Sequence, residues 1–360
     1  MAGETDLPAN DLQEVLAATA PLWEAARGEA IFVTGGTGFF GRWLLGSFAH
    51  ANAKLELGAR MVVLTRNAAA FRKRASGLSR ESAIALVEGD VRTFRATNVS
   101  QQLGENAPNR YRFVIHAATA ASAAGVYGSA ETVDTVVQGT QAALRFAAEG
   151  GAERFLFTSS GAVYGPQPPH LGLIAEDYSG GPELSSAQSA YGEAKRLAEV
   201  LCVSHGSQQR LAVSIARCFA FVGPYLPLDA QFAVGNFLQD SLHGRAISVS
   251  GDGTARRSYL YATDLAVALW TILFSGAPGR AYNVGSEEDV SVAELAHFIA
   301  RLAEPPLRVA IAQRAEPGTA VRRYLPSTER LRTELGFAPR VSLREALVRT
   351  HRWLAEQAHP

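Results

Sequence analysis

Cysteine is scarce in this chain of 360 residues, and clustered metal ligands are missing too. Only Cys202 and Cys218 occur, which excludes a disulfide framework and a cysteine-based structural zinc site. The histidines are scattered and show no paired metal-ligand spacing, so the sequence predicts no metal site. We expect both cysteines to be small hydrophobic side chains of the core.

An excess of charge is also absent. The 34 Lys and Arg residues balance the 34 Asp and Glu residues, so the formal net charge is zero. This balance argues against a polybasic protein that binds nucleic acid by neutralising phosphates, and against an acidic tail. Because 47% of the residues are hydrophobic, the chain can bury a sizeable core, and its length predicts roughly two domains.

Long apolar runs are missing as well. The most apolar stretch, residues 265–274, is too short to cross a bilayer. The first ten residues contain Glu4 and Asp6 and no apolar run, which is unlike a signal peptide. The sequence therefore predicts a cytoplasmic protein with neither a membrane nor a nucleic acid among its partners.

Short runs rich in Val, Ile and Phe alternate with helical stretches up to residue 218. Their near-continuous apolarity is typical of parallel strands that are buried on both faces. The alternation predicts an α/β fold with a Rossmann-type, doubly wound parallel sheet. The expected strands are 30–34, 60–65, 83–88, 113–117, 154–158 and 211–216, with helices at 40–49, 133–148 and 190–204.

The pattern differs on either side of this region. Residues 7–27 predict an extra helix before the first strand. From about residue 219, Pro224 and Pro227 interrupt the chain, and short strands mix with helices. A ligand is expected in the cleft between the two resulting lobes. The predicted units are a helical extension (1–28), a dinucleotide-binding Rossmann domain (29–218) and a smaller C-terminal α/β lobe that mainly binds substrate (219–360).

A glycine-rich loop follows the first strand. Residues 34–41 read Thr-Gly-Gly-Thr-Gly-Phe-Phe-Gly and open a helix. Glycine permits the tight turn, lets a pyrophosphate approach the backbone and lets the helix pack closely on the sheet, while the helix N-terminus faces the anion. The loop therefore predicts a bound nicotinamide dinucleotide, with contacts from Gly35, Gly38, Phe39, Phe40 and Gly41.

The end of the second strand bears on the choice between NAD and NADP. An acidic residue there would hydrogen-bond the ribose 2′-hydroxyl, but the sequence has Thr65 and Arg66 instead. A guanidinium can pair with a 2′-phosphate, so Arg66 favours NADP, and a solvated surface arginine is the alternative. Further cofactor contacts are expected after the third and fourth strands, from Asp90, Val91, Ala117 and Ala118.

A candidate catalytic group lies at the start of the 190–204 helix. Tyr191 and Lys195 are four residues apart, so their side chains share one helix face. A nearby ammonium favours the phenolate form of a tyrosine and lowers its pKa. Ser160 ends the fifth strand, where doubly wound folds bind their ligands, and its hydroxyl can bond the substrate oxygen that Tyr191 protonates or deprotonates. Lys195 can also hold the nicotinamide ribose.

With these motifs in place, the chain resembles the extended short-chain dehydrogenase/reductase family, in its nucleotide-sugar epimerase/dehydratase group. The resemblance covers residues 30–350, and its motifs are specific for the family but not for the substrate. The matching segments, in family order, are 34–41, 116–118, 157–165, 191–195, 217–224, 257–264 and 282–285.

The resemblance implies roles for several residues. Ser160, Tyr191 and Lys195 are then the catalytic triad, and all three also face the dinucleotide or the substrate. Arg257 would bind the diphosphate of a nucleotide sugar, since a bidentate guanidinium suits phosphate. Asn236 would contact the substrate from the smaller lobe.

The chain departs from the family pattern at four positions. Family members that dehydrate a sugar usually carry an Asp-Glu pair after the catalytic Ser or Thr, but Gly161 and Ala162 stand here. Because neither side chain transfers protons, dehydration is disfavoured. Many family members carry an Asn that hydrogen-bonds on the cofactor side, and this chain has Val136 at that position. Many also carry an Asn shortly before the Gly-Pro of the 217–224 segment, where this chain has Ala220.

Other residues leave two interpretations open. Glu176 and Asp177 lie in the loop before Tyr191, where the resemblance places them over the substrate, but solvated charge is favoured. Tyr164 either lines the sugar site or packs. The Arg322-Arg323 pair either reaches a diphosphate or is solvated.

The sequence thus predicts an NAD(P)-dependent epimerase of a nucleotide-diphosphate sugar, with transient oxidation at C4, that forms a homodimer. An NADPH-dependent 4-ketoreductase is the first alternative. A 4,6-dehydratase and a non-catalytic dinucleotide-binding module are the remaining ones, and the intact Ser160, Tyr191 and Lys195 argue against the latter.

Overall fold

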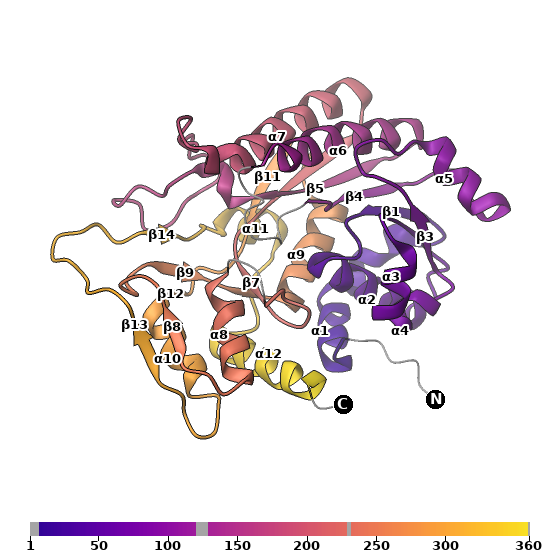
Figure 1. The fold of residues 1–360 in the computed structure, drawn as a ribbon. Helices are drawn as coiled ribbons and strands as arrows, with labels where there is room; N and C mark the ends of the chain where they lie inside the picture. Colours follow the sequence, from indigo (N-terminus) through magenta and orange to yellow (C-terminus); the bar gives the residue numbers. More distant parts are fainter. Residues whose placement is uncertain (1–6, 120–128, 229–231, 359–360) are drawn as a thin grey trace.

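The computed structural model describes residues 7–119, 129–228 and 232–358. Within them, seven strands form one parallel sheet, and strand order reverses between β1 and β4 (Figure 1). This order confirms the predicted doubly wound sheet. The strands, in spatial order, are β11 (Arg280–Val284), β6 (Ala212–Cys218), β5 (Arg154–Ser160), β4 (Phe113–His116), β1 (Ala30–Thr34), β2 (Arg60–Thr65) and β3 (Ile84–Glu88).

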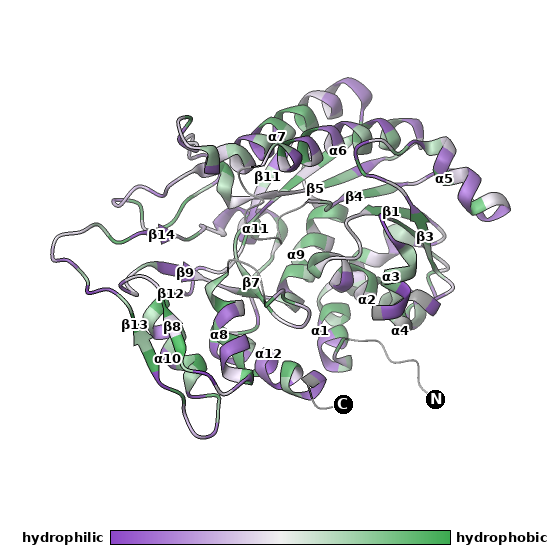
Figure 2. Ribbon diagram, in the orientation of Figure 1, coloured by the Kyte–Doolittle hydropathy of each residue, from purple (hydrophilic) through white to green (hydrophobic). Residues whose placement is uncertain are grey.

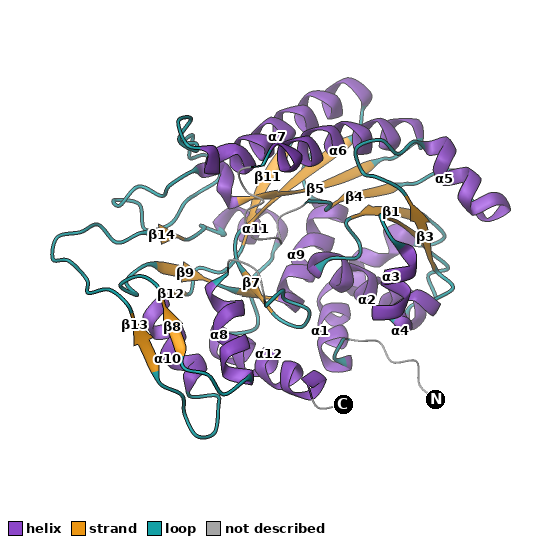
Figure 3. Ribbon diagram, viewed as in Figure 1, coloured by secondary structure: helices purple, strands orange, loops and turns teal. Residues whose placement is uncertain are grey.

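Helices cover both faces of the sheet, as buried parallel strands require (Figure 3). The pair α6 (Ala130–Glu149) and α7 (Ala190–Gln209) packs on one face. The other face carries α2 (Phe39–Lys54) and α9 (Ala262–Ser275). Helix α9 is apolar on nearly all sides and buried along almost its whole length, which explains its central position. Shorter helices near β2 and β3 are α3 (Ala68–Arg74), α4 (Ser76–Arg80) and α5 (Ala96–Leu103).

The predicted strand positions agree closely with the structure. The bounds of β1 and β2 are those expected from the sequence, and β5 ends at Ser160, as expected, two residues beyond the apolar run 154–158. The seventh strand, β11, was not expected in this sheet. It comes from the C-terminal part of the chain and pairs with β6 from Arg280 to Val284, because its apolar face completes the layer that α9 covers.

The smaller lobe has a hydrophobic core of its own, visible as green segments in Figure 2. Phe237, Ile247, Leu295 and Leu347 are among the side chains buried there. The lobe's helices are α8 (Ala233–Leu242), α10 (Val292–Ala300) and α12 (Leu343–Ala358), while α11 (Glu329–Leu335) packs against β11. Its short strands are β7 (Phe221–Val222), β8 (Ile247–Val249), β9 (Arg256–Ser258), β10 (Leu260–Tyr261), β12 (Asp289–Ser291), β13 (Val309–Ile311) and β14 (Arg323–Tyr324).

The N-terminal segment, expected to be helical, forms α1 (Ala9–Thr19) and the 3₁₀-helix η1 (Ala20–Ala26). Trp23 is fully buried, and its ring lies 4.5 Å from that of Trp270 in α9. Asp11 accepts a hydrogen bond from the Tyr261 hydroxyl (2.6 Å) and pairs with Arg349 of α12 (3.0 Å). The segment therefore ties the sheet domain to the end of the chain. Among the described residues, no helix combines the length and apolarity needed to cross a bilayer.

Candidate active site

The glycine loop connects β1 to α2 and approaches its neighbours closely. Gly35 has φ +75°, and a Cβ added there would lie 2.5 Å from the backbone of Ala117 after β4. At Gly41 an added Cβ would lie 2.2 Å from the backbone of Gly36, so glycine is needed for α2 to pack against the loop. These contacts bring the N-terminus of α2 to the end of the sheet.

The outer side of this loop fits a dinucleotide. Gly38 is exposed, and within the described part of the chain an added Cβ would meet only the Gly35 carbonyl oxygen, at 3.7 Å. A side chain would thus fill the space that a pyrophosphate needs to reach the helix N-terminus. Across the loop, Ala117 and Ala118 donate backbone N–H groups to the Thr34 carbonyl (3.1 Å) and hydroxyl (3.3 Å).

The two loop phenylalanines are half-buried. The Phe40 ring packs edge-on against Phe221 of β7, with centroids 5.1 Å apart, and the Phe39 ring lies 5.8 Å from that of Phe40. The loop is therefore also anchored to the first segment of the smaller lobe.

At the far end of this site, Arg66 is exposed directly after β2. Asp90, after β3, forms an ion pair with Arg92, with 2.5 Å between the charged atoms. The hydrogen bonds from Arg92 lower the pKa of the Asp90 carboxyl group, and the positive charge of Arg66 lowers it further. Val91 lies against Gly139 of α6, where an added Cβ would be 3.2 Å from it. The structure thus places Arg66 within electrostatic range of Asp90.

Lys195 is almost completely buried, with 1% of its surface exposed. Its ammonium donates a hydrogen bond to the Thr158 carbonyl of β5 (2.8 Å) and lies 4.7 Å from the Phe157 ring centroid. The Tyr191 ring centroid is 5.9 Å from the same nitrogen, so the two side chains share one helix face as predicted. Burial lowers the pKa of Lys195 to about 8.

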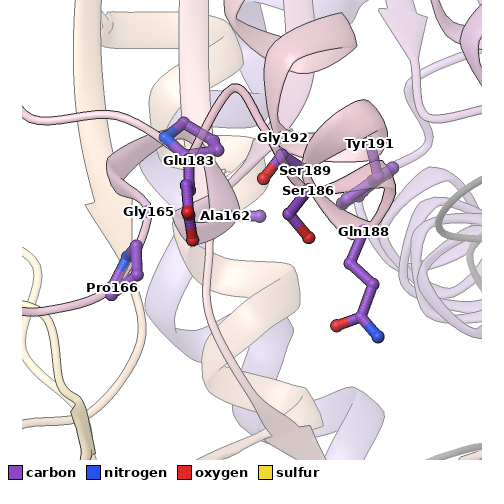
Figure 4. Close-up of a pocket in the computed structure, with 10 residues that line it drawn as sticks. Ala162, Gly165, Pro166, Glu183, Ser186, Gln188, Ser189, Tyr191 and Gly192 are labelled. Carbon is purple, nitrogen blue, oxygen red and sulfur yellow. The ribbon is translucent and has the colours of Figure 1, made fainter.

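Ser160 ends β5 and begins the 3₁₀-helix η4 (Gly161–Tyr164). Its hydroxyl accepts a hydrogen bond from the Ala162 backbone N–H (3.1 Å), which fixes the side chain at the strand end. Helix η4 packs against α7, and between them lies a pocket of about 400 Å³. Figure 4 shows Gly165 and Pro166 on one side of this pocket and Tyr191 on the other. The expected Ser, Tyr and Lys therefore gather around the end of β5.

A buried polar network beneath these residues escaped the sequence analysis. Glu199 of α7 accepts a hydrogen bond from the Ser159 hydroxyl (2.5 Å) and pairs with Arg217 of β6 (2.7 Å). Arg217 also donates to the Tyr164 hydroxyl (2.9 Å), which donates to Asn283 of β11 (2.7 Å). The one available signal was Glu199 at helical spacing from Lys195, on the same face of α7. The network fixes the strand ends on which the site is built.

The prediction that Glu176 is a solvated charge is wrong. Its side chain is buried, accepts the Asn283 backbone N–H (2.8 Å) and lies 3.8 Å from Arg330. These partners offset the cost of burial, which nevertheless raises the pKa of the carboxyl group. Asp177 is exposed, and Tyr164 packs in the interior, where burial raises its pKa to about 12.

The smaller lobe carries the two residues expected to bind substrate. Arg257 of β9 is half-buried, donates to the Arg256 carbonyl (2.9 Å) and lies 5.8 Å from the ring centroid of Tyr324. Burial lowers its pKa. Asn236 lies exposed on α8, Arg322 is exposed, and Arg323 donates to the Pro169 carbonyl (3.2 Å). No three His, Cys, Asp or Glu side chains in the described ranges gather as a metal site.

The fold and these motifs define a nicotinamide-dependent protein of the extended short-chain dehydrogenase/reductase class. The family model described as "NAD dependent epimerase/dehydratase family" matches residues 31–285. The chain therefore belongs to this family, and the family cofactor confirms the predicted nicotinamide dinucleotide.

Individual relatives share this family but differ in reaction. UDP-glucuronic acid decarboxylase 6 of Arabidopsis thaliana is 31% identical over 61% of this chain and 63% of its own length, so the match spans less than two thirds of that relative. UDP-glucuronic acid decarboxylase 1 of Danio rerio is 28% identical over 91% of this chain and 73% of its own. An epimerase structure from Methanothermobacter thermautotrophicus has a TM-score of 0.77 at 26% identity, covering 95% of this chain and 97% of that one.

Proposed function

We propose that this protein is an NAD-dependent epimerase that transiently oxidises a nucleotide-diphosphate sugar, at C4. The observation that carries the proposal is the buried Lys195 ammonium, fixed to the Thr158 carbonyl and adjacent to Tyr191 on one face of α7. A buried positive charge stabilises a neighbouring phenolate, which can then take a proton at neutral pH. When bound, NAD supplies a hydride acceptor and later a hydride donor.

Each residue of the chain has a defined task in this proposal. The Tyr191 hydroxyl oxygen takes the proton of the sugar hydroxyl and returns it at the end of the cycle. The Ser160 hydroxyl donates a hydrogen bond to the same sugar oxygen and so orients it. Lys195 stabilises the phenolate and holds the nicotinamide ribose. Arg257 and Asn236 hold the nucleotide diphosphate from the smaller lobe.

The dinucleotide would lie along the ends of β1, β2, β3 and β4. The open space at Gly38 and the N-terminus of α2 support a pyrophosphate site at the loop. The contacting residues that we propose are Gly35, Gly38, Phe39, Phe40, Gly41, Arg66, Asp90, Val91, Ala117, Ala118, Tyr191 and Lys195.

Two other reactions share part of this chemistry: a 4-ketoreductase carries out only the reduction of the ketone, and a decarboxylase carries out the oxidation at C4 before it loses carbon dioxide. A 4-ketoreductase using NADPH is favoured by the exposed Arg66 after β2. A decarboxylase is favoured by the relatives named UDP-glucuronic acid decarboxylases. Oxidation at C4 of a uronic acid leaves a ketone β to the carboxylate, and such acids lose carbon dioxide. Dehydration is disfavoured, because Gly161 and Ala162 supply neither acid nor base beside Ser160.

One incubation series separates epimerisation from decarboxylation and dehydration. The NAD-loaded protein is mixed with UDP-, dTDP-, GDP- and CDP-hexoses and with UDP-glucuronic acid, and products are identified by mass and by proton NMR. Epimerisation gives an isomer of unchanged mass with an inverted C4. A mass decrease of carbon dioxide would assign the decarboxylase, and a decrease of water would contradict the exclusion of dehydration. With Tyr191→Phe as control, every turnover product should disappear.

As domains we propose the helical extension 1–28, the dinucleotide-binding domain 29–218 and the mainly substrate-binding lobe 219–360, from which α9 and β11 pack into the layers of the dinucleotide-binding domain.

We also propose a homodimer that forms through α7. Leu197, Val200 and Val203 are spaced along one side of α7 and are 47%, 63% and 43% exposed. Val200→Glu is expected to dissociate the dimer in sedimentation velocity. A monomeric wild-type protein would contradict this part of the proposal.

A further inference from the structure

Two short strands connect the lobes. The chain leaves the large sheet after β6 and enters the smaller lobe through β7, and it returns through β10 into α9. Strands β7 and β10 form a parallel pair, with Leu260 opposite Phe221 and Tyr261 opposite Val222. Segments that cross between two lobes absorb the change in backbone angles when the lobes move apart. The β7–β10 pair is therefore the candidate hinge of this protein.

Tyr261, the last residue of β10, lies against three helices that do not belong to the hinge. Its side chain is fully buried, and its hydroxyl donates a hydrogen bond of 2.6 Å to Asp11 of α1. The Trp43 ring of α2 packs edge-on with 6.2 Å between ring centroids, and the Arg349 guanidinium carbon of α12 lies 5.6 Å from the Tyr261 centroid. The hinge thus contacts the N-terminal segment, the helix that follows the glycine loop and the last helix.

The hydrogen bond between Asp11 and Tyr261 is a buried, charge-assisted one. Asp11 is 3% exposed, and while its Oδ2 atom accepts the Tyr261 hydroxyl, its Oδ1 atom accepts the Arg349 guanidinium at 3.0 Å. Hydrogen bonds to ionised groups are stronger than those between neutral groups, and a low-dielectric interior strengthens them further. The other strand of the hinge is bonded as well, because the Trp43 indole donates to the Pro224 carbonyl directly after β7 (3.1 Å).

The position of the lobes matters for one ligand and not for the other. In the proposed function the dinucleotide contacts residues of the sheet domain alone, whereas the nucleotide sugar is held by Ser160 and Tyr191 from the sheet domain and by Arg257 from the smaller lobe. Opening at the hinge therefore separates the two halves of the sugar-nucleotide site and leaves the dinucleotide site whole. We propose that Asp11 is a positioning residue that, by bonding Tyr261, holds the hinge in the lobe arrangement that binds the nucleotide sugar. This inference rests on the proposed function.

The test compares a ligand that spans both lobes with one that contacts a single lobe. UDP-, dTDP-, GDP- and CDP-glucose are titrated by calorimetry into NAD-loaded protein, and NAD is titrated into protein freed of NAD. Tyr261→Phe removes only the hydroxyl and should bind the nucleotide sugar about 3- to 10-fold more weakly, because the binding-competent lobe arrangement is then less populated and a charge-assisted hydrogen bond corresponds to about tenfold in an equilibrium constant. Its affinity for NAD should stay unchanged.

Further variants separate this role from a general effect on stability. Asp11→Ala should weaken sugar-nucleotide binding in the same way, and the Asp11→Ala/Tyr261→Phe double variant should lose no more than the weaker-binding single variant. Asp11→Asn, whose amide oxygen can still accept the hydroxyl, should recover affinity relative to Asp11→Ala. Glu14→Gln is the matched control, because Glu14 pairs with the same Arg349 from the same helix (2.9 Å), and it should bind both ligands like the wild type.

The lobe arrangement is also measured without any nucleotide. Both native cysteines are buried, so nitroxide labels can be directed to Gln101→Cys on α5 and Ser248→Cys on β8, two exposed positions in different lobes. Double electron–electron resonance, on labelled protein diluted with unlabelled protein, then gives the distances within one chain. Tyr261→Phe should broaden this distance distribution, and Glu14→Gln should leave it unchanged.

The possible failures are distinguishable. Wild-type affinity of Tyr261→Phe for the nucleotide sugar, equal weakening for NAD, or an unchanged distance distribution overturns the role of Asp11 and leaves the proposed function intact. If the wild-type protein binds none of these nucleotide sugars and gives no turnover in the incubation series, the proposed function fails. The distance distribution then decides the hinge separately: a broadened one supports the contact of Asp11 with Tyr261 as its restraint, and an unchanged one overturns it.

Discussion

Replacing Lys195 by methionine should change how stability depends on pH. Burial lowers the pKa of Lys195 from its ordinary 10.5 to about 8. The unfolded chain therefore binds more protons than the native protein between these two values, so this group makes the wild type more stable as pH rises. From pH 7 to pH 10 the gain is about 2–3 kcal/mol, by the linkage relation with one pKa unit worth about 1.36 kcal/mol.

Because Lys195 is proposed to lower the pKa of Tyr191, the comparison is made in a Tyr191→Phe background, where Lys195→Met removes the Lys195 titration without shifting that of a neighbouring phenol. Urea unfolding at pH 7, 8, 9 and 10 gives the free energy of unfolding of both proteins. The protein that keeps Lys195 should gain about 2–3 kcal/mol on the Lys195→Met variant across this range. Lys54→Met, which removes an exposed ammonium at the end of α2, is the control. A pH-independent difference for Lys195→Met would refute the reasoning.

Three further outcomes are expected. Tyr191→Phe should lower turnover at least ~100-fold, because the phenol oxygen moves the proton, but leave dinucleotide binding nearly intact, because the ring still packs. Near-normal turnover of this variant would remove Tyr191 from the mechanism. Arg66→Ala should reduce any preference for NADP over NAD about tenfold or more, since a charge-assisted hydrogen bond to the 2′-phosphate contributes about 1.5–3 kcal/mol. If the wild type binds NAD more tightly than NADP in a fluorescence titration, the proposed role of Arg66 is contradicted. Tyr111→Phe should raise the free energy of unfolding by about 1 kcal/mol, because the buried Tyr111 hydroxyl has no hydrogen-bond partner within the described residues. An unchanged free energy of unfolding in urea would contradict this prediction.

The sheet and the cofactor loop could be predicted because their signals are local. A buried parallel strand is apolar along its whole length, and the bounds of β1 and β2 followed from that pattern. The glycine loop is equally local, since close backbone approach at Gly35 and Gly41 admits no other residue type. The shared face of Tyr191 and Lys195 needed only helical spacing.

The remaining features depend on contacts between residues far apart in the chain. Nothing local in β11 distinguishes a strand of the smaller lobe from one that pairs with β6. The burial of Glu176 depends on Asn283, which follows it by 107 residues. Likewise, the sequence showed only that Gly161 supplies no acid or base. The structure shows that the Tyr324 hydroxyl occupies the space that a side chain at position 161 would need.

The contact between the first helix and the last has a consequence for folding during synthesis. Asp11 of α1 pairs with Arg349 of α12 across 338 residues of sequence. During synthesis α1 therefore leaves the ribosome long before α12, which carries its ion-pair partner. The ion pair of Asp11 can form only once α12 has been made, and closing such a long loop is slow compared with forming local helices.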